Sequence, residues 1–311
     1  FTPEQDESRL TAGFMWQTLK RTPAVYPLAS AVTSFIPEHD NVEIMYITVK
    51  NQSKTAQRFS ACAAVPIYGR SADNIRDHRN VTSMLHRIHT DEKGIYVCPT
   101  MSFDEKGHRP NSRIYYVLGC TGDSRLPECF YPTVEDFIGE GGTFLHPRAV
   151  YEAYPGHKAF CSAEGREAMG AFRFEKITLA PGETVDFILL LGIEDKKEAV
   201  ETVFEKYNTS AKIQKAFSST KSYWQNQIVA DFHTKEADFD RLMKWVCFQP
   251  FLRRLFGCSF LPYHDYGRGG RGWRDLWQDC LSLLLMEPDR VGHMIALNYE
   301  GVRIDGTNAT I

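Results

Sequence analysis

The residue types best able to do chemistry lie in one short segment, residues 267–279, near the carboxyl-terminal end of the chain. The segment reads Gly-Arg-Gly-Gly-Arg-Gly-Trp-Arg-Asp-Leu-Trp-Gln-Asp. At about 100° per residue, a helix that begins at Trp273 gathers a cation, two carboxylates and an amide on one arc and apolar side chains on the other. The polar arc contains Arg274, Asp275, Gln278 and Asp279. Such groups can form paired hydrogen bonds with ligand hydroxyls, but the same arc would also suit a solvated helix face.

The loop before this helix, residues 267–272, lacks bulky side chains except for Arg268 and Arg271. Its glycines permit backbone conformations and close approaches of a ligand that other residues forbid. The four residues before the loop supply hydrogen-bonding groups, partly on flat rings: Tyr263, His264, Asp265 and Tyr266. Because a sugar offers hydroxyls to polar side chains and C–H faces to aromatic rings, we predict a carbohydrate-binding corner here.

Nucleic acid and metal ions fit the sequence less well as ligands. Residues 268–272 read Arg-Gly-Gly-Arg-Gly, a composition found in nucleic-acid-binding segments, but they form one short copy in a chain of net charge −3. The spacings among His78, His86, His89 and His108 do not build a ligand set for a metal. We therefore expect neither nucleic acid nor a metal ion at this protein.

The elements that must position the corner begin with a long region of strand-like patterns. Pro181-Gly182-Glu183 predicts a hairpin turn between the last two of these runs. No long helical pattern separates the runs, so that residues 1–192 predict an antiparallel β-sandwich. The runs occupy residues 42–49, 59–68, 113–118, 168–179 and 184–191.

Helical spacing of apolar residues replaces strand alternation after residue 192. Two helices, over 194–208 and 212–228, form a predicted helical linker at residues 193–232. The remaining residues, 233–311, predict a helical domain, and Pro250 should kink or divide its first helix. The helices expected there span residues 239–256, 273–286 and 289–299.

The amino-acid composition is that of an ordinary globular protein, with 43% hydrophobic and 24% charged residues. Its eight cysteines are scattered and form no Cys-x-x-Cys pair, which favours free thiols in a reducing compartment, and so a cytoplasmic protein. No apolar run approaches the roughly 18 residues that span a bilayer, and no signal peptide opens the chain. Because the chain begins at Phe1 and ends just after a Gly-Thr-Asn turn, we expect a fragment of a longer protein.

Residues 274–279, Arg-Asp-Leu-Trp-Gln-Asp, resemble the R-D-x-x-Q-D helix start of glycoside hydrolase family 94, which includes the cellobiose and chitobiose phosphorylases. The longer patterns at residues 263–279 and 301–308 look most like the 1,2-β-oligoglucan phosphorylases of that family. The resemblance implies a galactose-mutarotase-like β-sandwich, a helical linker and an (α/α)6 barrel. This chain would then contain most of the sandwich, the linker and the first barrel helices.

The same resemblance implies roles for the polar residues of the corner. Arg274 and Asp279 would hydrogen-bond hydroxyls of the glucosyl unit on the non-reducing side of the scissile bond. Asp275 and Gln278 would support them or reach the sugar, and Arg271 joins the substrate-binding set. Asp305 falls where the family has a loop at the rim of the cleft, although an Asp before Gly306 also suits a simple turn.

The implied activity is inverting phosphorolysis of a β-linked glucooligosaccharide, which yields α-glucose 1-phosphate. One acid protonates the glycosidic oxygen, and phosphate itself is the nucleophile, so that no cofactor is expected beyond this co-substrate. Asp275 and Asp279 lie near arginines and should stay ionised, which is the wrong state for a proton donor. We therefore expect the acid and most phosphate ligands beyond Ile311, and the 311 residues alone to be inactive.

Two alternatives remain open from the sequence. The first is a hydrolase with the same architecture that uses water in place of phosphate. The second is a non-catalytic carbohydrate-binding sandwich at residues 1–190, in which Trp16, Tyr131 and Tyr151 would be sugar platforms. The linkage and length of the sugar also stay open, as does a homodimer, since the family has dimeric members.

Overall fold

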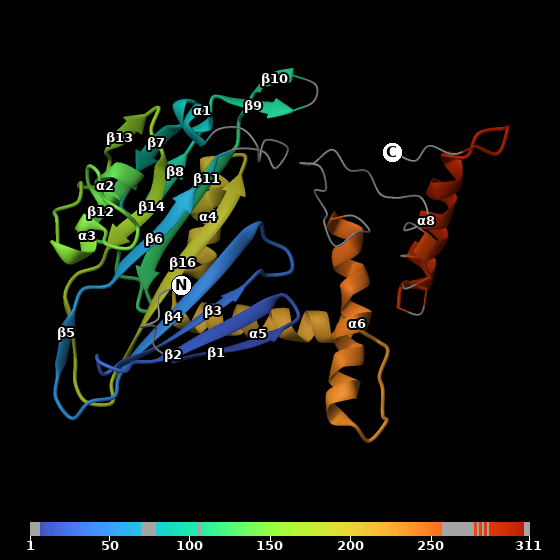
Figure 1. The fold of residues 1–311 in the computed structure, drawn as a ribbon, viewed down its shortest axis with the longest axis horizontal. Coiled ribbons are helices and arrows are strands. Elements are labelled where there is room, and N and C mark those ends of the chain that lie inside the picture. Colours follow the sequence, from blue (N-terminus) through green and yellow to red (C-terminus); the bar gives the residue numbers. More distant parts are fainter. Residues whose placement is uncertain are drawn as a thin grey trace. The chain divides into compact units, whose positions relative to one another are not determined.

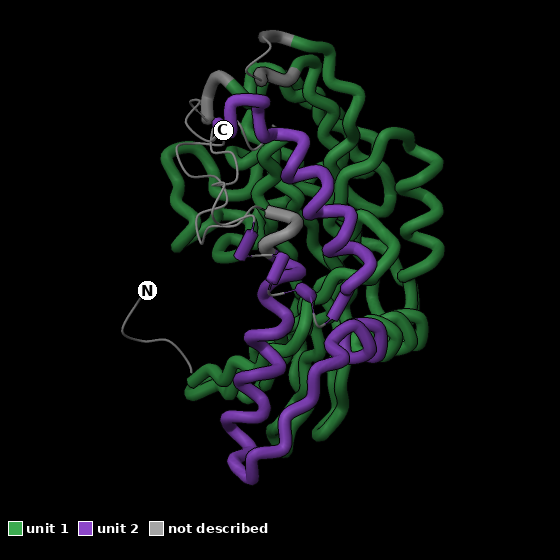
Figure 2. The backbone as a smooth tube through the Cα atoms, turned by 90° about the vertical axis from the view of Figure 1, so that its right-hand side faces the viewer, with its two compact units in different colours: residues 1–71, 77–221 green, residues 72–76, 222–311 purple. Residues whose placement is uncertain are grey.

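The computed structural model describes residues 7–69, 79–104, 107–256, 277–278, 280–281, 283–284 and 286–307. It divides into two compact units, of which the first comprises residues 1–71 and 77–221 and the second residues 72–76 and 222–311 (Figure 2). The division falls inside a helix of the predicted linker. Each unit is described separately below.

The first unit is built on a large antiparallel sheet (Figure 1). Neighbouring strands pair in antiparallel register throughout, for example Leu118 with Leu190 and Leu190 with Ile44. In spatial order the strands are β1 (Glu7–Gly13), β2 (Trp16–Thr22), β3 (Leu28–Phe35), β4 (Val42–Asn51), β16 (Thr184–Glu194), β11 (Ile114–Thr121), β8 (Gly94–Val97), β7 (Arg87–Thr90) and β13 (Ser162–Glu164).

Smaller antiparallel sheets complete the strands of this unit. Three strands form one of them, in the order β12 (Cys129–Thr133), β14 (Ala168–Arg173) and β6 (Cys62–Ile67). Two further pairs join β15 (Ile177–Leu179) to β5 (Gln57–Phe59) and β9 (Met101–Asp104) to β10 (Gly107–Pro110). The prediction of an antiparallel β-sandwich-like region is therefore confirmed.

The large sheet buries apolar side chains on both faces, because successive residues of a strand point to opposite sides. Leu118 and Leu190 face a core that includes the helix residues Val200 and Phe204. Their neighbours Val117 and Leu189 face the other core, which contains Phe172 of the three-stranded sheet. One face of the large sheet is thus covered by helices and the other by a second sheet.

The helices on the first face are α4 (Lys197–Tyr207) and α5 (Ser210–Gln227). Val200, Val203, Phe204 and Tyr207 of α4 are buried against the sheet, as their helical spacing predicted. Ile213 of α5 enters the same core. Three short helices in the strand region were not predicted: α1 (Arg79–Met84), α2 (Val134–Ile138) and α3 (Arg148–Tyr151).

The predicted hairpin at Pro181-Gly182-Glu183 is only half right. The turn forms, with Gly182 at φ 80° and the Glu183 amide donating to the Ala180 carbonyl at 3.1 Å. The flanking strands do not form a ladder with each other in the described structure: β15 pairs with β5, and β16 with β4 and β11. The strand-like run at 168–179 breaks at residues 174–176 into two strands, and this break carries β15 away from β16.

Asn51 joins this turn to the end of β4 and is fully buried. Its Nδ2 donates to the carbonyls of Thr55, Leu179 and Ala180 at 2.8, 3.0 and 3.2 Å. Its Oδ1 accepts bonds from the Ser53 amide and hydroxyl at 2.9 and 2.8 Å. A single amide side chain therefore satisfies backbone groups from two separated segments.

Replacing Asn51 by Ala should lower the free energy of unfolding by about 3 kcal/mol, because several buried groups lose their partners at once. Urea denaturation of the two proteins measures this difference. The exposed neighbour Gln52 provides the control, since Gln52→Ala removes an amide side chain at the surface. An equal effect of both substitutions would contradict the structural role given to Asn51.

The second unit consists of helices in its described part. α6 (Ala237–Phe256) runs through Pro250 as one helix, so the proline does not divide it, and the alternative prediction of a kink at Pro250 stays a prediction. The rings of Trp224 and Trp245 both pack on Phe248, with centroids 5.3 and 5.4 Å away. Trp224 also packs on Phe251, with centroids 6.2 Å apart. α8 (Pro288–Glu300) begins with a proline in its first turn, where the missing N–H costs nothing.

The described part of the chain contains seven cysteines, and all are free thiols, as predicted. Within the same residues, no group of three or more metal-ligating side chains is found. None of the helices there combines the length and the hydropathy that crossing a bilayer requires.

Candidate functional site

The helix expected to carry the sugar ligands is partly described, and its two sides differ as predicted. Residues 277, 278, 280, 281 and 283 are helical. Cys280 and Leu283 are buried in a small core with Val291 of α8, whereas Gln278 is exposed. At about 100° per residue Leu284 also falls on the apolar side of the helix, but it is half-exposed.

Contacts with α8 position this helix within the second unit. The Trp277 ring packs edge-to-face on Tyr299, with ring centroids 5.0 Å apart and an interplanar angle of 63°. Asn298 Nδ2 donates to the Cys280 thiol at 3.7 Å. These contacts fix the buried side of the helix, and Gln278 consequently stays on the side that solvent or a ligand can reach.

The other predicted ligands of the corner, Arg271, Arg274, Asp275 and Asp279, lie outside the described residues. The same is true of the glycine-rich loop and of residues 263–266. Their binding roles therefore remain predictions from the sequence.

Asp305 is described, and its carboxylate stabilises a turn. Its Oδ1 accepts hydrogen bonds from the Thr307 hydroxyl at 2.7 Å and from the Thr307 amide at 2.9 Å. These bonds lower the pKa of Asp305 below its usual value, so that the carboxylate is ionised at neutral pH. Gly306 follows with φ 81°, as a turn of this kind requires. The turn-stabilising interpretation of Asp305 fits this geometry, and contact with substrate remains a prediction.

The three aromatic residues considered as sugar platforms on the sandwich have different environments. Tyr131 is 1% exposed and donates its hydroxyl to the Tyr154 carbonyl at 2.6 Å, so it is a core residue and the platform interpretation is wrong. Trp16 packs edge-to-face on Phe217 of α5, with centroids 5.4 Å apart. Tyr151 is exposed but stacks on His146 at 3.6 Å, which occupies one face of its ring.

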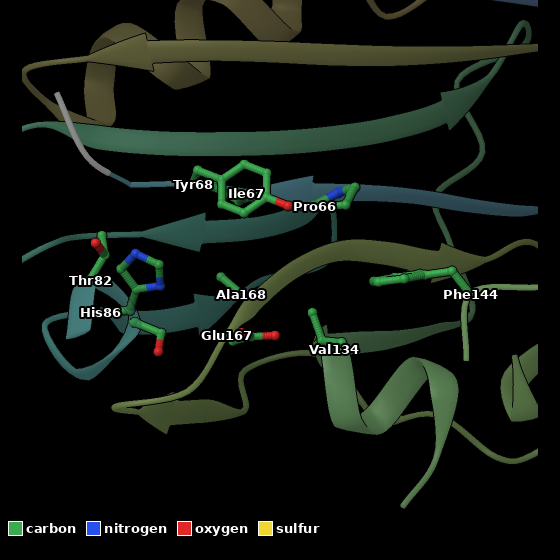
Figure 3. A pocket seen from close by; sticks show the side chains of 10 residues that line it. Pro66, Ile67, Tyr68, Thr82, His86, Val134, Phe144, Glu167 and Ala168 are labelled. Atoms are coloured by element: carbon green, nitrogen blue, oxygen red, sulfur yellow. The ribbon is translucent and has the colours of Figure 1, made fainter. Parts of the chain in front are cut away.

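A cavity that the sequence analysis did not predict lies within the first unit (Figure 3). Its wall is formed by the end of β6, by α1 and the turn after it, by the start of α2, by the loop containing Phe144, and by the residues that lead into β14. Tyr68, His86, Phe144 and Glu167 surround one space, and each comes from a different one of these segments. His86 and Glu167 are about eighty positions apart in the chain, so no spacing rule could have linked them.

The described geometry defines the class of protein: an antiparallel sandwich with helices on one face, followed by a helical unit. Residues 22–210 match the family model of the glycosyl hydrolase 94 supersandwich domain. This range covers β3 to the start of α5 and more than half of the chain. The chain belongs to the glycosyl hydrolase 94 family.

One curated relative is N,N'-diacetylchitobiose phosphorylase from Vibrio proteolyticus, which is 26% identical over 265 residues. The alignment covers 83% of this chain and 30% of the relative, so that the chain spans about a third of the length of that enzyme. The 265 aligned residues are more than the part of the chain that precedes α5, which begins at Ser210. The similarity therefore continues past the sandwich into the helices.

Similarity to solved structures is low. A polysaccharide lyase superposes with a TM-score of 0.33 and 9% identity over 60% of this chain and 23% of its own. The family GH92 α-mannosidase from Bacteroides thetaiotaomicron gives a TM-score of 0.30 and 10% identity over 76% of this chain and 24% of its own.

Proposed function

We propose that this chain forms part of an inverting glycoside phosphorylase that cleaves β-linked glucooligosaccharides with inorganic phosphate and releases α-glucose 1-phosphate. The observation that carries the proposal is membership of the glycosyl hydrolase 94 family through residues 22–210. The similarity to a chitobiose phosphorylase supports it, since the alignment covers 83% of this chain and so extends beyond the sandwich.

In this reaction a phosphate oxygen attacks the anomeric carbon from the face opposite the leaving group. The bond between that carbon and the glycosidic oxygen breaks, and an acid gives its proton to the departing oxygen. Arg274 and Asp279 hold hydroxyls of the glucosyl unit and so fix the anomeric carbon for in-line attack, while Asp275, Gln278 and Arg271 support the same ring. The acid is assigned to none of the 311 residues.

We further propose β-1,2-linked glucan oligosaccharides as the substrates. The support is the resemblance of residues 263–279 and 301–308 to 1,2-β-oligoglucan phosphorylases. We also propose that residues 233–311 are the beginning of an (α/α)6 barrel, that the sandwich is galactose-mutarotase-like, and that the protein works in the cytoplasm. Free thiols at all seven described cysteines support the last point.

Phosphate dependence of the full-length enzyme tests the proposed reaction. Glucooligosaccharides with β-1,2, β-1,3 and β-1,4 linkages are incubated with and without inorganic phosphate, and glucose 1-phosphate and free glucose are measured separately. We expect glucose 1-phosphate only when phosphate is present, with the β-1,2 series turned over fastest. Release of glucose without phosphate would instead identify a hydrolase.

The 311-residue chain provides a second arm of this experiment. Because the acid is assigned to none of its residues, the chain alone should release no glucose 1-phosphate under the same conditions. Turnover by this chain would refute the assignment of the acid to another part of the enzyme.

A further inference from the structure

Another cavity of the first unit lies between the turn after β3 and the helices α4 and α5. Residues 37–40 form one part of its wall, and the end of α4 and the first half of α5 form the rest. Its volume of about 370 Å³ is within the range typical of small-ligand pockets. The titratable side chains of this wall include Glu38, His39, Asp40, Lys206, Lys212 and Lys215.

Both carboxylates of the wall already have donors within the protein. Asp40 Oδ2 accepts hydrogen bonds from Lys206 Nζ at 2.6 Å and from the Tyr207 hydroxyl. Burial raises the pKa of Asp40, but these two hydrogen bonds and the Lys206 charge outweigh it and leave the pKa below its usual value. Glu38 accepts from two hydroxyls of α5, at 3.1 and 3.3 Å. The carboxylates therefore join the turn to the helices, and Asp40 neutralises the charge of Lys206.

Lys212 is held in place without being neutralised. Its Nζ donates to the carbonyl oxygen of Glu205 at 2.6 Å and to the side-chain oxygen of Asn208 at 2.9 Å, and both acceptors are uncharged. An ammonium group has three N–H donors, so that one of them is left for a ligand in the described structure. Because two bonds already restrict the side chain, binding of an anion to Lys212 costs little side-chain entropy.

Lys215 adds a second ammonium group that is not neutralised. It lies three residues after Lys212, on the same side of α5. Its side chain is exposed, and within the described ranges it has neither an ion pair nor a hydrogen bond. Like charges at this spacing on one helix repel each other. An anion between the two ammonium groups would replace this repulsion by two attractions.

We propose that this cavity binds the phosphate group of a small ligand through Lys212 and Lys215. The two ammonium groups donate to different phosphate oxygens, and Pro37 and Ala216 supply apolar wall for the rest of the ligand. The choice of phosphate rests on the proposed function, in which inorganic phosphate is consumed and a sugar phosphate is formed. The site lies entirely within the first unit and shares no residue with the predicted sugar ligands at residues 271–279.

Other classes of ligand match this wall less well. A neutral sugar would leave both ammonium charges unpaired, and a divalent cation would be repelled by them. A carboxylate brings one negative charge, whereas a phosphate monoester carries about two at neutral pH. A phosphate group therefore matches the two ammonium groups that have no counter-ion in the protein.

Calorimetric titration of the 311-residue chain in phosphate-free buffer tests the site, with inorganic phosphate, glucose 1-phosphate and glucose as probes. Lys215→Gln removes the charge of an exposed side chain and should weaken binding of both phosphates about tenfold. Lys212→Gln should act in the same direction, and its melting temperature is recorded because Lys212 also joins α5 to the end of α4. The matched control is Lys176→Gln, the same change at an exposed lysine outside the cavity wall, which should bind like the parent chain.

The two phosphates identify the source of the bound group. Equal affinities that fall in Lys215→Gln support a site for the phosphate group alone. Tighter binding of glucose 1-phosphate, with the same dependence on Lys215, supports a site for a sugar phosphate.

The outcomes also separate this site from the proposed reaction. No binding of either phosphate, or affinities that are unchanged in Lys215→Gln, would overturn the site, whatever the full-length enzyme catalyses. Glucose bound as tightly as glucose 1-phosphate would also overturn it. Lysine-dependent phosphate binding would support the site even if the full-length enzyme released glucose without phosphate, a result that refutes only the proposed reaction.

Discussion

Replacing Arg274 by Ala should reduce phosphorolysis by the full-length enzyme by about 100-fold or more. A guanidinium that holds two hydroxyls of the reacting ring contributes on the order of 3 kcal/mol to the transition state, and each 1.4 kcal/mol corresponds to about tenfold in rate. Steady-state release of glucose 1-phosphate, expressed as kcat/KM, measures the loss. Asp279→Asn should act in the same direction, because an amide offers one acceptor where a carboxylate offers two.

The matched control for Arg274→Ala is Arg290→Ala in the same unit. Arg290 is an exposed arginine of α8 whose guanidinium lies 3.8 Å from the carboxylate of Glu287. An ion pair at this distance with an exposed guanidinium contributes little, so that this variant should retain the parent activity. Equal activities of the Arg274 and Arg290 variants would remove Arg274 from the substrate-binding set.

Partial rescue distinguishes a ligand of the sugar from a merely structural arginine. Arg274→Lys keeps the charge but cannot form the paired bonds of a guanidinium, so its kcat/KM should lie between those of the parent and Arg274→Ala. A fall in kcat/KM with an unchanged melting temperature is expected for a ligand. A parallel fall in melting temperature would indicate that Arg274 supports the fold instead.

The largest effect on stability is expected for Phe172→Ala, which should lower the free energy of unfolding by about 3–5 kcal/mol. Phe172 is fully buried between the large sheet and the three-stranded sheet, and its ring packs on Phe130 and Phe174 with centroids 6.4 and 5.7 Å away. On its other side the ring lies against Gly119, where a Cβ would come within 2.3 Å of it. The Gly119 backbone has no side chain that could move into the space left by the ring.

Urea denaturation of the 311-residue chain, followed by tyrosine and tryptophan fluorescence, measures the change for Phe172→Ala. Tyr26→Ala, which truncates a largely exposed ring of the same unit, should change the free energy of unfolding by no more than about 0.5 kcal/mol. A loss below about 1 kcal/mol for Phe172→Ala would mean that the two sheets move together and fill the space left by the ring. Such a result would contradict rigid packing of the large sheet against the three-stranded sheet.

The parts of the fold that follow from local periodicity were predictable. Alternation at residues 42–49 defines β4, and the apolar spacing of Val200, Val203, Phe204 and Tyr207 defines α4 and its buried side. Strand and helix periods belong to the chain itself, so they can be recognised before any partner is known. The same reasoning placed Cys280 and Leu283 inside and Gln278 outside on the site-bearing helix.

Features that depend on partners distant in the sequence were not predictable. The turn at Pro181-Gly182-Glu183 was recognised, but the partners of the strands around it were not, because Asn51 and β5 lie more than 120 positions earlier. Tyr131 was considered a surface platform, since an aromatic side chain suits a core and a sugar site equally well. It is buried because it packs in a core with Phe137 of α2, Ala149 of α3 and Met169 of β14.

Residue types and spacing were enough to single out residues 267–279 from the sequence alone. This segment comprises the glycine-rich loop and the Arg-Asp-Leu-Trp-Gln-Asp helix start. Residues of one helical arc are adjacent by the geometry of the helix, so that their order along the chain is sufficient to group them. The cavity around His86 required the tertiary structure, because its polar and aromatic groups come from segments that only sheet pairing brings together.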